Sequence, residues 1–249
     1  MSDTIMTAVG VAVGALHRRL GRPGQDAALA VAHPDLAVVV LAVADGCGSA
    51  RASEVGAQLG VRLWARAVER GLRAGLAPAD PAMWAAARAA VVASLAGLAD
   101  ELAPDRERAI AEVLLFTSLV AVVGPGGGAV YTVGDGCYQA AAAPPVVLAA
   151  EADNCPAYLA YDLVGEPAVG HLTVMPPSPR GVVWLGTDGL STLVATGCPE
   201  LRALLACPRS AAHPDRLRRQ LERWARGGDA PARLTDDAAI ALARWGDAP

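Results

Sequence analysis

Aromatic residues are scarce in this sequence. Only 4% of the 249 residues are aromatic, and Phe116 is the single phenylalanine. The hydrophobic content is nevertheless 53%, which is enough for a core, so we expect that core to consist of Ala, Val and Leu. The length permits one large domain or two small ones. We predict one domain over residues 1–249, because the Pro- and Gly-rich breaks are too short to be linkers.

Cysteine pairs are also missing. The five cysteines form neither CxxC motifs nor sets with histidine at the spacing of metal ligands, and their odd number argues against a complete disulfide framework. This usage fits a reducing compartment. We expect Cys137 and Cys207 to be buried as small apolar side chains, whereas Cys47 lies in an Asp-Gly loop and its role stays open.

Long hydrophobic runs and an excess of positive charge are absent. No stretch reaches the ~18 uninterrupted apolar residues of a membrane span, and the N-terminus lacks the basic region of a signal peptide. A net charge of −4 gives no general attraction to nucleic acid or to an anionic membrane. The basic run at residues 216–226 has apolar residues at helical spacing and indicates a solvated helix face. We therefore expect a cytoplasmic protein that acts without nucleic acid or a membrane.

Three apolar, strand-like runs end in Asp-Gly, at Asp45, Asp135 and Asp188. A strand that ends on an acidic residue, followed by a glycine that can turn at positive φ, places a carboxylate at the edge of a sheet. Any single Asp-Gly is also a common hairpin turn. Together with Asp26 near the start and Asp236 near the end, the three endings predict carboxylates that converge on one hard-metal site.

Electrostatics makes such convergence informative. Two unneutralised carboxylates about 4 Å apart repel by roughly 4 kcal/mol at an effective dielectric constant near 20. A cluster of them therefore needs protons or cations. Mg²⁺ or Mn²⁺ is the simpler answer, because one ion satisfies several oxygens at once and keeps water for chemistry.

The distribution of apolar residues predicts an α+β sandwich. Residues 16–26 indicate a basic loop, and the strands from 113 to 150 are expected to form a hairpin that continues as a meander. Strands occur in blocks with paired helices between them, which differs from the regular alternation of a parallel sheet. Helices are predicted at 49–72, 80–102, 199–206 and 214–226, and strands at 5–15, 27–32, 36–44, 113–123, 129–133, 137–142, 146–150, 170–175, 181–187 and 238–244.

The ordered motifs resemble the metal-dependent protein phosphatases of type 2C, and within them a compact bacterial branch. The matching segments follow the family's order over nearly the whole chain: residues 14–28, 40–58, 117–123, 131–139, 182–193 and 235–242. The resemblance implies a four-layer α-β-β-α sandwich with two central antiparallel sheets flanked by helix pairs. It also implies a serine/threonine phosphatase that acts on phosphorylated proteins and opposes a serine/threonine kinase pathway. We expect a monomer.

The resemblance assigns two Mn²⁺ or Mg²⁺ ions to one edge of the sandwich. Asp45 would bridge both ions, the Gly46 carbonyl would help to hold the second, and Asp188 and Asp236 would bind the first. Asp26 would hold a metal-bound water, and Asp135 would serve a weaker third ion. A water between two ions would lose its proton and attack phosphorus in line, with no phospho-enzyme. The Cys-x5-Arg loop of the cysteine phosphatases does not occur around any cysteine.

Two departures from the family pattern concern substrate chemistry. Cys47 stands where the family's Asp-Gly-His-Gly loop has a histidine that is often assigned to protonation of the leaving group. It is either a poor donor or a spacer. Arg22 is the candidate for gripping the substrate phosphate. Its rivals in the same loop are His17, Arg18 and Arg19.

Other departures concern the acidic set. Gln25 replaces an acidic residue before Asp26, and Thr192 stands where many members carry another acidic ligand, so a third ion would be held loosely. Asp237 is expected to be a hydrogen-bonding neighbour of Asp236. Structural or solvated roles are expected for His33, His171 and His213.

Two further hypotheses stay open. The chain could be a catalytically weak or inactive pseudophosphatase that binds phosphoproteins as a regulatory module, a reading favoured by the missing histidine and the altered arginine position. Alternatively, the aspartates are only turn residues of an ordinary α+β domain.

Overall fold

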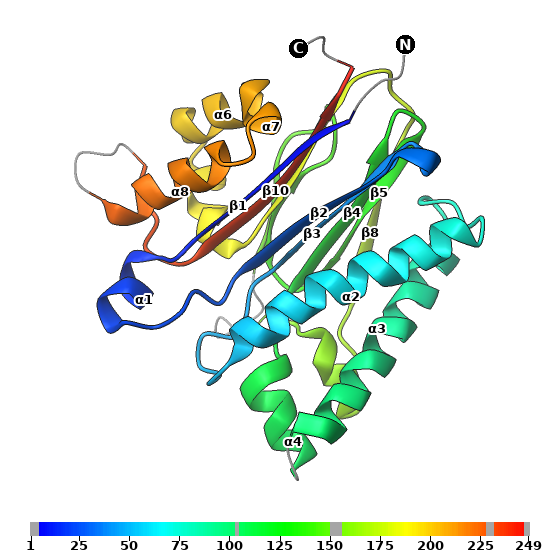
Figure 1. The fold of residues 1–249 in the computed structure, drawn as a ribbon, viewed down its shortest axis with the longest axis vertical. Coiled ribbons are helices and arrows are strands. Elements are labelled where there is room, and N and C mark those ends of the chain that lie inside the picture. Colours follow the sequence, from blue (N-terminus) through cyan, green and yellow to red (C-terminus); the bar gives the residue numbers. More distant parts are fainter. Residues whose placement is uncertain (1–4, 103–104, 150–155, 228–231, 247–249) are drawn as a thin grey trace.

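Two antiparallel sheets of five strands lie face to face at the centre of the structure (Figure 1). The computed structural model describes residues 5–102, 105–149, 156–227 and 232–246. The first sheet, here sheet A, has the order β1 (Met6–Ala12), β10 (Ala238–Trp245), β9 (Gly181–Gly186), β6 (Gly136–Gln139) and β7 (Val146–Leu148). The second sheet, sheet B, has the order β2 (Ala27–His33), β3 (Val38–Ala44), β4 (Ser118–Gly124), β5 (Gly127–Val133) and β8 (Gly170–Met175).

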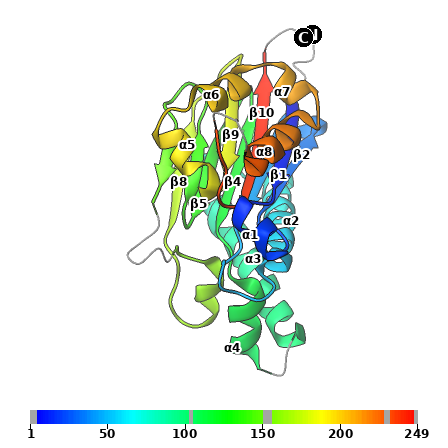
Figure 2. The same cartoon turned by 90° about the vertical axis from the view of Figure 1, so that its left-hand side faces the viewer.

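Helices cover the outer face of each sheet, which confirms the predicted four-layer α+β sandwich (Figures 1 and 2). Two long helices lie over sheet B, and a group of shorter helices lies over sheet A. The helices are α1 (Ala15–Leu20), α2 (Ser53–Arg73), α3 (Pro81–Leu102), α4 (Arg106–Ala109), α5 (Ser191–Ala195), α6 (Pro199–Ala206), α7 (Arg209–Ala212) and α8 (Arg216–Arg226).

Small aliphatic residues fill the space between the two sheets. Along β3, Val39, Leu41 and Val43 face sheet A, while the alternate residues Val40 and Ala42 face α2. Both faces of this strand are therefore buried, which explains why its sequence is continuously apolar instead of alternating. The prediction of an Ala, Val and Leu core holds for most of this layer, which also contains Tyr138, Met175 and Trp245.

Several other aromatic side chains lie instead between the sheets and the helices. The ring of Trp84 stacks on that of Tyr131 with centroids 5.3 Å apart, and Trp64 lies 5.5 Å from the same tyrosine. Trp184 and Trp224 are buried on the other side, between sheet A and its helices. The expectation of a core of Ala, Val and Leu is therefore wrong for the outer layers, where a few large aromatic rings fill the space between sheet and helices.

Three sequence-based expectations about local structure are wrong. Residues 15–20 of the expected basic loop form α1. The expected strand at 113–123 begins only at Ser118, because residues 110–114 continue α4 as a π-helical turn. The expected meander does not form either, since β5 pairs with β8, and β6 crosses to sheet A to pair with β9 and β7. Cys137 is buried as expected, but Cys207 is only half-buried.

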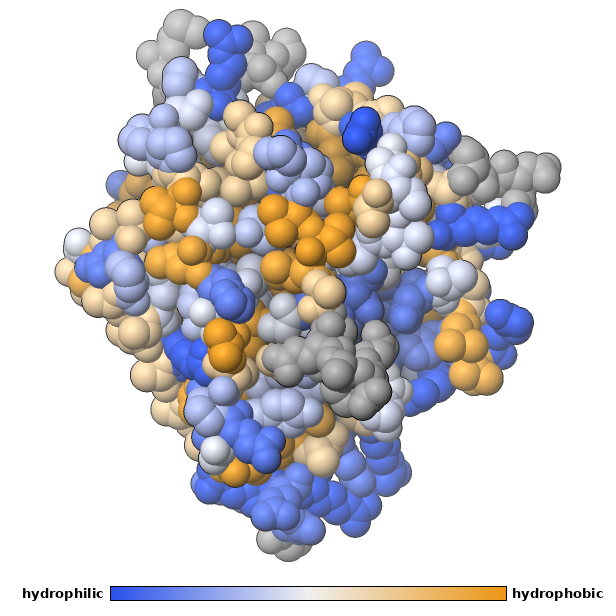
Figure 3. Space-filling model, turned by 180° about the vertical axis from the view of Figure 1, so that it is seen from behind, coloured by the Kyte–Doolittle hydropathy of each residue, from blue (hydrophilic) through white to orange (hydrophobic). Residues whose placement is uncertain are grey.

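Apolar residues also reach the surface. The edge strands expose Val146 and Val147 of β7 and Val174 of β8. Seen from behind, apolar side chains form several separate groups among hydrophilic ones (Figure 3). The helix α3 is long and apolar enough to cross a membrane by length and composition, which is weak evidence because the core helices of soluble proteins pass the same test. Its buried residues, among them Trp84 and Leu95, belong to the core beneath sheet B.

Candidate active site

A cleft of about 550 Å³ opens where strands from both sheets end. Asp45 follows β3, Asp135 connects β5 to β6, Asp188 follows β9, and Asp236 precedes β10. These four side chains and Gly46 line the cleft together. The structure thus brings together acidic residues that are up to 191 positions apart in the chain.

Backbone contacts fix the loop that carries Asp45. The Asp45 amide donates to Thr117 Oγ1 at 3.1 Å, and the Thr117 amide donates to the Asp45 carbonyl at 2.8 Å. The Gly46 amide donates to the Gln25 carbonyl at 3.2 Å. A Cβ atom on Gly46 would lie 2.9 Å from the backbone carbonyl oxygen of Gln25 and 2.9 Å from the carbonyl carbon of Ser53, so this position requires glycine.

The glycines of the Asp-Gly motifs serve different purposes. Gly136 has a φ of +133°, which is the conformational freedom we expected. Gly46 and Gly189 have no positive φ. They are glycines because another chain segment approaches closely: a Cβ atom on Gly189 would overlap the carbonyl oxygen of Asp237. The motif is therefore partly a packing signal and not only a turn signal.

Four carboxyl groups in or beside the cleft, those of Asp26, Asp45, Asp135 and Asp188, have raised pKa values. Burial raises the pKa of Asp26 to about 8, against the opposing effect of hydrogen bonds with Asp45 and Thr187. Burial and then the charges of Asp26 and Asp188 raise the pKa of Asp45 well above its usual range. Burial and then the charge of Asp135 raise the pKa of Asp188 to about 6. Burial also raises the pKa of Asp135. Burial is the largest cause of each shift, and for Asp26, Asp45 and Asp188 the charges of neighbouring carboxylates add to it.

The donor set fits a hard divalent cation. Asp26 and Asp45 share a hydrogen bond. Two ionised carboxylates have no proton to donate, so one of the two groups must be protonated when no cation is bound. Asp135 Oδ1 is buried, with no hydrogen-bond partner among the described residues. Without a cation, these oxygens must share protons or stay unpartnered. A divalent ion can coordinate several of them at once. Asp26 itself is oriented by Thr187, whose Oγ1 donates to Asp26 Oδ2 at 2.6 Å.

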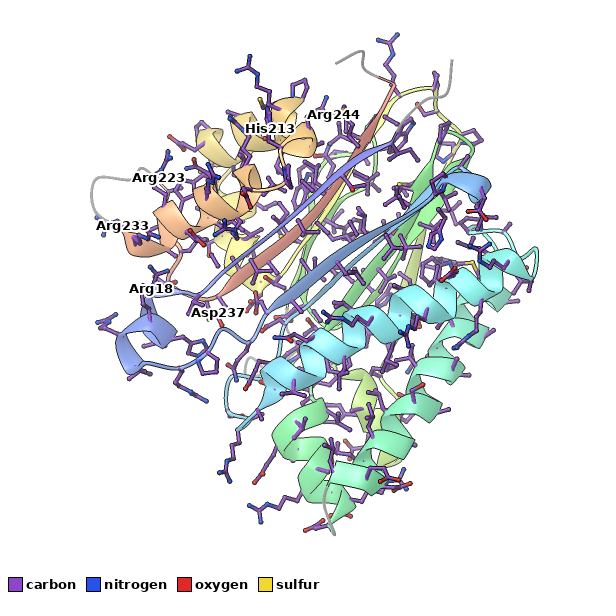
Figure 4. The ribbon with its side chains drawn as sticks, viewed as in Figure 1. Arg18, His213, Arg223, Arg233, Asp237 and Arg244 are labelled. Carbon is purple, nitrogen blue, oxygen red and sulfur yellow. The ribbon has the colours of Figure 1, made fainter. Side chains whose placement is uncertain are left out.

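A tighter cluster lies on one side of the cleft. Within the part of the chain that the structure describes, the group of potential metal ligands with donor atoms all within 4.8 Å of one another is His17, Asp236 and Asp237. Asp237 is already engaged, because it accepts from Gly14 N at 2.7 Å, Gln25 N at 2.7 Å and His17 Nδ1 at 2.8 Å. Its amide also donates to Asp236 Oδ1 at 2.9 Å, as expected of a neighbour. Asp237 therefore fastens α1 and the segment before Asp26 to the start of β10 (Figure 4).

Removal of divalent cations makes the folding stability depend on pH. The folded-state pKa of Asp26 is about 8, far above its usual value of 3.8. Between these values the folded state keeps a proton that the unfolded chain releases, so the free energy of unfolding falls as pH rises from about 4 to about 8. Asp188 adds to the fall up to about pH 6. We expect urea unfolding with a chelator to give the lowest midpoint at pH 8 and a higher one at pH 5.

Two additions sharpen this measurement. Saturating Mn²⁺ should abolish the loss, because the cation favours the ionised carboxylates. The variant Asp26→Asn should weaken the dependence between pH 6 and 8. A midpoint that rises with pH in the chelator would contradict the proposed charge crowding.

Arg22 lies over the loop that follows Asp45. Its Nη1 donates to the Gly48 carbonyl and its Nη2 to the Ala50 carbonyl, both at 3.4 Å, and the side chain lines the cleft. The rivals are less well placed. His17 also lines the cleft, but its Nδ1 is engaged by Asp237, whereas Arg18 donates to the Val13 carbonyl at 2.8 Å and is not among the residues that line the cleft. The geometry therefore favours Arg22 over these two residues.

Cys47 also lines the cleft. Its Sγ lies 3.2 Å from Ser49 Oγ. Burial raises the pKa of the Cys47 thiol, but hydrogen bonds with Ser49 and Tyr158 outweigh burial and leave the pKa below its usual range. Thr192 is exposed on α5 and does not line the cleft. Its hydroxyl group therefore does not take over the place of an acidic metal ligand.

Sequence reasoning missed several residues of this cleft. Thr187 lies inside the Gly-Thr-Asp-Gly segment, and its position directly before Asp188 was an available signal. No motif marks Tyr158 and Tyr161, which line the cleft from the segment before β8. Leu16 and Leu20 line it from α1, which we expected to be a loop.

Comparison with known proteins agrees with this geometry. A family model described as protein phosphatase 2C matches residues 13–224. The structure of PppA, a regulatory component of the T6SS in Pseudomonas aeruginosa, is 17% identical with a TM-score of 0.63, and 97% of each chain is covered. The catalytic domain of the serine threonine protein phosphatase PstP, in complex with two manganese ions, is 19% identical with a TM-score of 0.60, over 98% of this chain and 100% of that one.

A third solved structure, the serine/threonine phosphatase Stp1 from Staphylococcus aureus, is 15% identical with a TM-score of 0.61, over 96% of this chain and 94% of that one. A search of curated proteins found no match. The structural likenesses, at these low identities, show a shared fold. The family model goes further, because residues 13–224 include the segments that carry Arg22, Asp45 and Asp188. The match extends over more than half of the chain, and the protein therefore belongs to the protein phosphatase 2C family.

Proposed function

We propose that this chain is a Mn²⁺- or Mg²⁺-dependent phosphatase that hydrolyses phosphoserine and phosphothreonine in proteins. One observation carries the proposal: acidic side chains from distant segments line one cleft, where burial and neighbouring carboxylates raise the pKa values of Asp45 and Asp188. Carboxylates crowded in this way are suited to holding divalent ions. Asp45, Asp188 and Asp236, with the Gly46 carbonyl, would hold two of them, and Asp135 would serve a weaker third.

The residues of the cleft divide the work. Bound divalent ions would supply an activated water and offset the charge that develops on the phosphoryl oxygens. Arg22, on the rim, would bind and orient the phosphate through its planar guanidinium. Asp26 would orient water from within the wall of the cleft, since Thr187 holds its carboxyl group. Cys47, which shares a hydrogen bond with Tyr158, would be the group that supplies a proton to a leaving serine oxygen.

The cellular setting follows from the same proposal. A phosphatase of phosphoserine and phosphothreonine would oppose a serine/threonine kinase pathway, and the likeness to PstP and Stp1 supports this assignment. We propose that the chain acts as a cytoplasmic monomer and as one catalytic domain over residues 1–249.

Phosphate release from a phosphoserine peptide tests the proposed function. We expect turnover in Mn²⁺ and a loss of about a hundredfold or more with a chelator, because metal ions supply several kcal/mol of transition-state stabilisation. Activity that is equal with and without the chelator would contradict metal dependence. A parallel assay with p-nitrophenyl phosphate shows whether the chemistry works when no peptide has to bind.

Cys47 favours a second candidate function. A half-buried thiol is a poorer acid for an alkoxide leaving group than a histidinium, so the chain could bind phosphoproteins and release phosphate slowly or not at all. Such a pseudophosphatase would bind the phosphopeptide in Mn²⁺, as measured by calorimetry, and show no turnover of either substrate. The variant Cys47→His should then raise turnover.

A further inference from the structure

The short helix α1 exposes two large apolar side chains. Leu16 is 52% exposed and Leu20 is 61% exposed. Because they are four residues apart, they lie on the same face of the helix. Exposure of a single leucine is ordinary, but two on one short helix form an apolar patch, which we call the Leu16–Leu20 face.

This face belongs to the wall of the cleft. Leu16 and Leu20 line the same cleft as Asp45 and Asp188, and Leu115 and Tyr161 add further apolar surface to it. The lining of the cleft therefore combines carboxylates, which are suited to cations that would in turn bind a phosphate, with apolar side chains. At about 550 Å³ the cleft also has the size of a site that binds more than a phosphate group.

The Leu16–Leu20 face is held in place. The Leu16 amide donates to the Thr235 carbonyl at 3.2 Å, and His17, on the same helix, is fastened to Asp237. The helix ends at Gly21, whose φ of +63° suits glycine, and the Arg22 amide then donates back to the His17 carbonyl at 2.9 Å. A surface that is preorganised in this way costs little entropy when a partner binds.

We propose that the Leu16–Leu20 face binds a large apolar side chain of the substrate, close in sequence to its phosphoserine or phosphothreonine. This inference rests on the proposed function, because it names the class of segment that the site accepts. A peptide is the fitting occupant, since it carries a phosphate and an apolar side chain on one backbone and matches the two parts of the cleft. Arg18 (Figure 4) and Arg19 lie beside the face and are both exposed. Their positive charges add attraction for the phosphorylated segment of the substrate.

Paired phosphopeptides test the proposal. The two peptides of a pair differ only at one position within three residues of the phosphoserine, where one has Leu and the other Ser. We expect kcat/KM and affinity by fluorescence anisotropy in Mn²⁺ to favour the Leu peptide about 10- to 100-fold at one of the positions, which is the usual discrimination of an apolar pocket. The variants Leu16→Ser and Leu20→Ser should bring this ratio close to one, and Leu20→Met should keep it.

Controls separate the possible failures. Leu102→Ser removes a leucine that is 46% exposed at the end of α3 and should leave the ratio as in the wild type. Equal binding and turnover of all peptide pairs by the wild type would overturn the inference while leaving the proposed function intact. If the wild type releases no phosphate from any substrate, the proposed function fails, and the anisotropy ratio still decides whether the Leu16–Leu20 face reads an apolar side chain.

Discussion

The variant Asp45→Asn should lose about a thousandfold in kcat/KM on a phosphoserine peptide in Mn²⁺. Asn keeps the size of the side chain but removes the charge, and loss of about 4 kcal/mol of transition-state stabilisation corresponds to that factor. The same variant should unfold at a higher temperature than the wild type in a chelator. Desolvation and then the charges of Asp26 and Asp188 raise the pKa of Asp45, so its replacement removes a free-energy cost that the metal-free fold has to bear.

Opposite changes in activity and stability distinguish a functional residue from a structural one. Steady-state kinetics and thermal unfolding are measured on the same preparation. Asp35→Asn is a matched control, because Asp35 is an exposed carboxylate that pairs with Arg73 far from the cleft, and its variant should retain wild-type turnover. An Asp45→Asn protein that is both active and less stable would refute the assignment of Asp45 to the metal site.

The variant Asp237→Asn should lower the free energy of unfolding by about 3 kcal/mol, the scale for breaking a buried charged hydrogen-bond network. Asp237 is 3% exposed and accepts from Gly14, Gln25 and His17 through its two oxygens. The side-chain amide of Asn has only one oxygen that can accept. Its NH₂ group would take the place of the other carboxylate oxygen and would face the amide of Gly14 or Gln25, which is also a donor. Urea unfolding at pH 7 measures the loss.

The same substitution should also affect the cleft. Because Asp237 holds α1 and the segment before Asp26, we expect KM for phosphopeptides to rise more than kcat falls. Asp215→Asn is the matched control, since Asp215 pairs with Arg218 and Arg219 on the surface, and its variant should unfold like the wild type. Unchanged stability of Asp237→Asn would show that the three hydrogen bonds do not hold the two ends of the chain together.

Much of the cleft could be predicted because its residues follow strands. Asp45 and Asp188 stand directly after apolar runs, and in antiparallel sheets such endings occur at the edges, where they can meet. The sequence could not show which edge each belongs to. β6 looks like the continuation of a hairpin, yet its partner β9 lies more than 40 residues later, so local pattern carries no information on the pairing.

The remaining errors also have physical causes. α1 has only six residues and little intrinsic stability, and it is held by Asp237, 220 positions away from His17. The run before β4 is rich in Val and Leu and reads as strand, but residues 110–114 pack as helix against α2. Tyr158 and Leu20 belong to no recognisable motif, because many different apolar side chains can form the wall of a cleft. Tertiary contacts decide each of these cases.

The position of β10 has a consequence for biosynthesis. This strand lies between β1 and β9 and pairs with both, and it follows all the other described strands in the sequence. On the ribosome, all the strands of sheet B emerge before it, so that half of the sandwich can begin to assemble early. The first strand must wait for residues 238–245 before it finds its neighbour. Asp236, two residues before β10, emerges at the same stage, so the cleft of a nascent chain should stay incomplete until residues 236–245 have been synthesised.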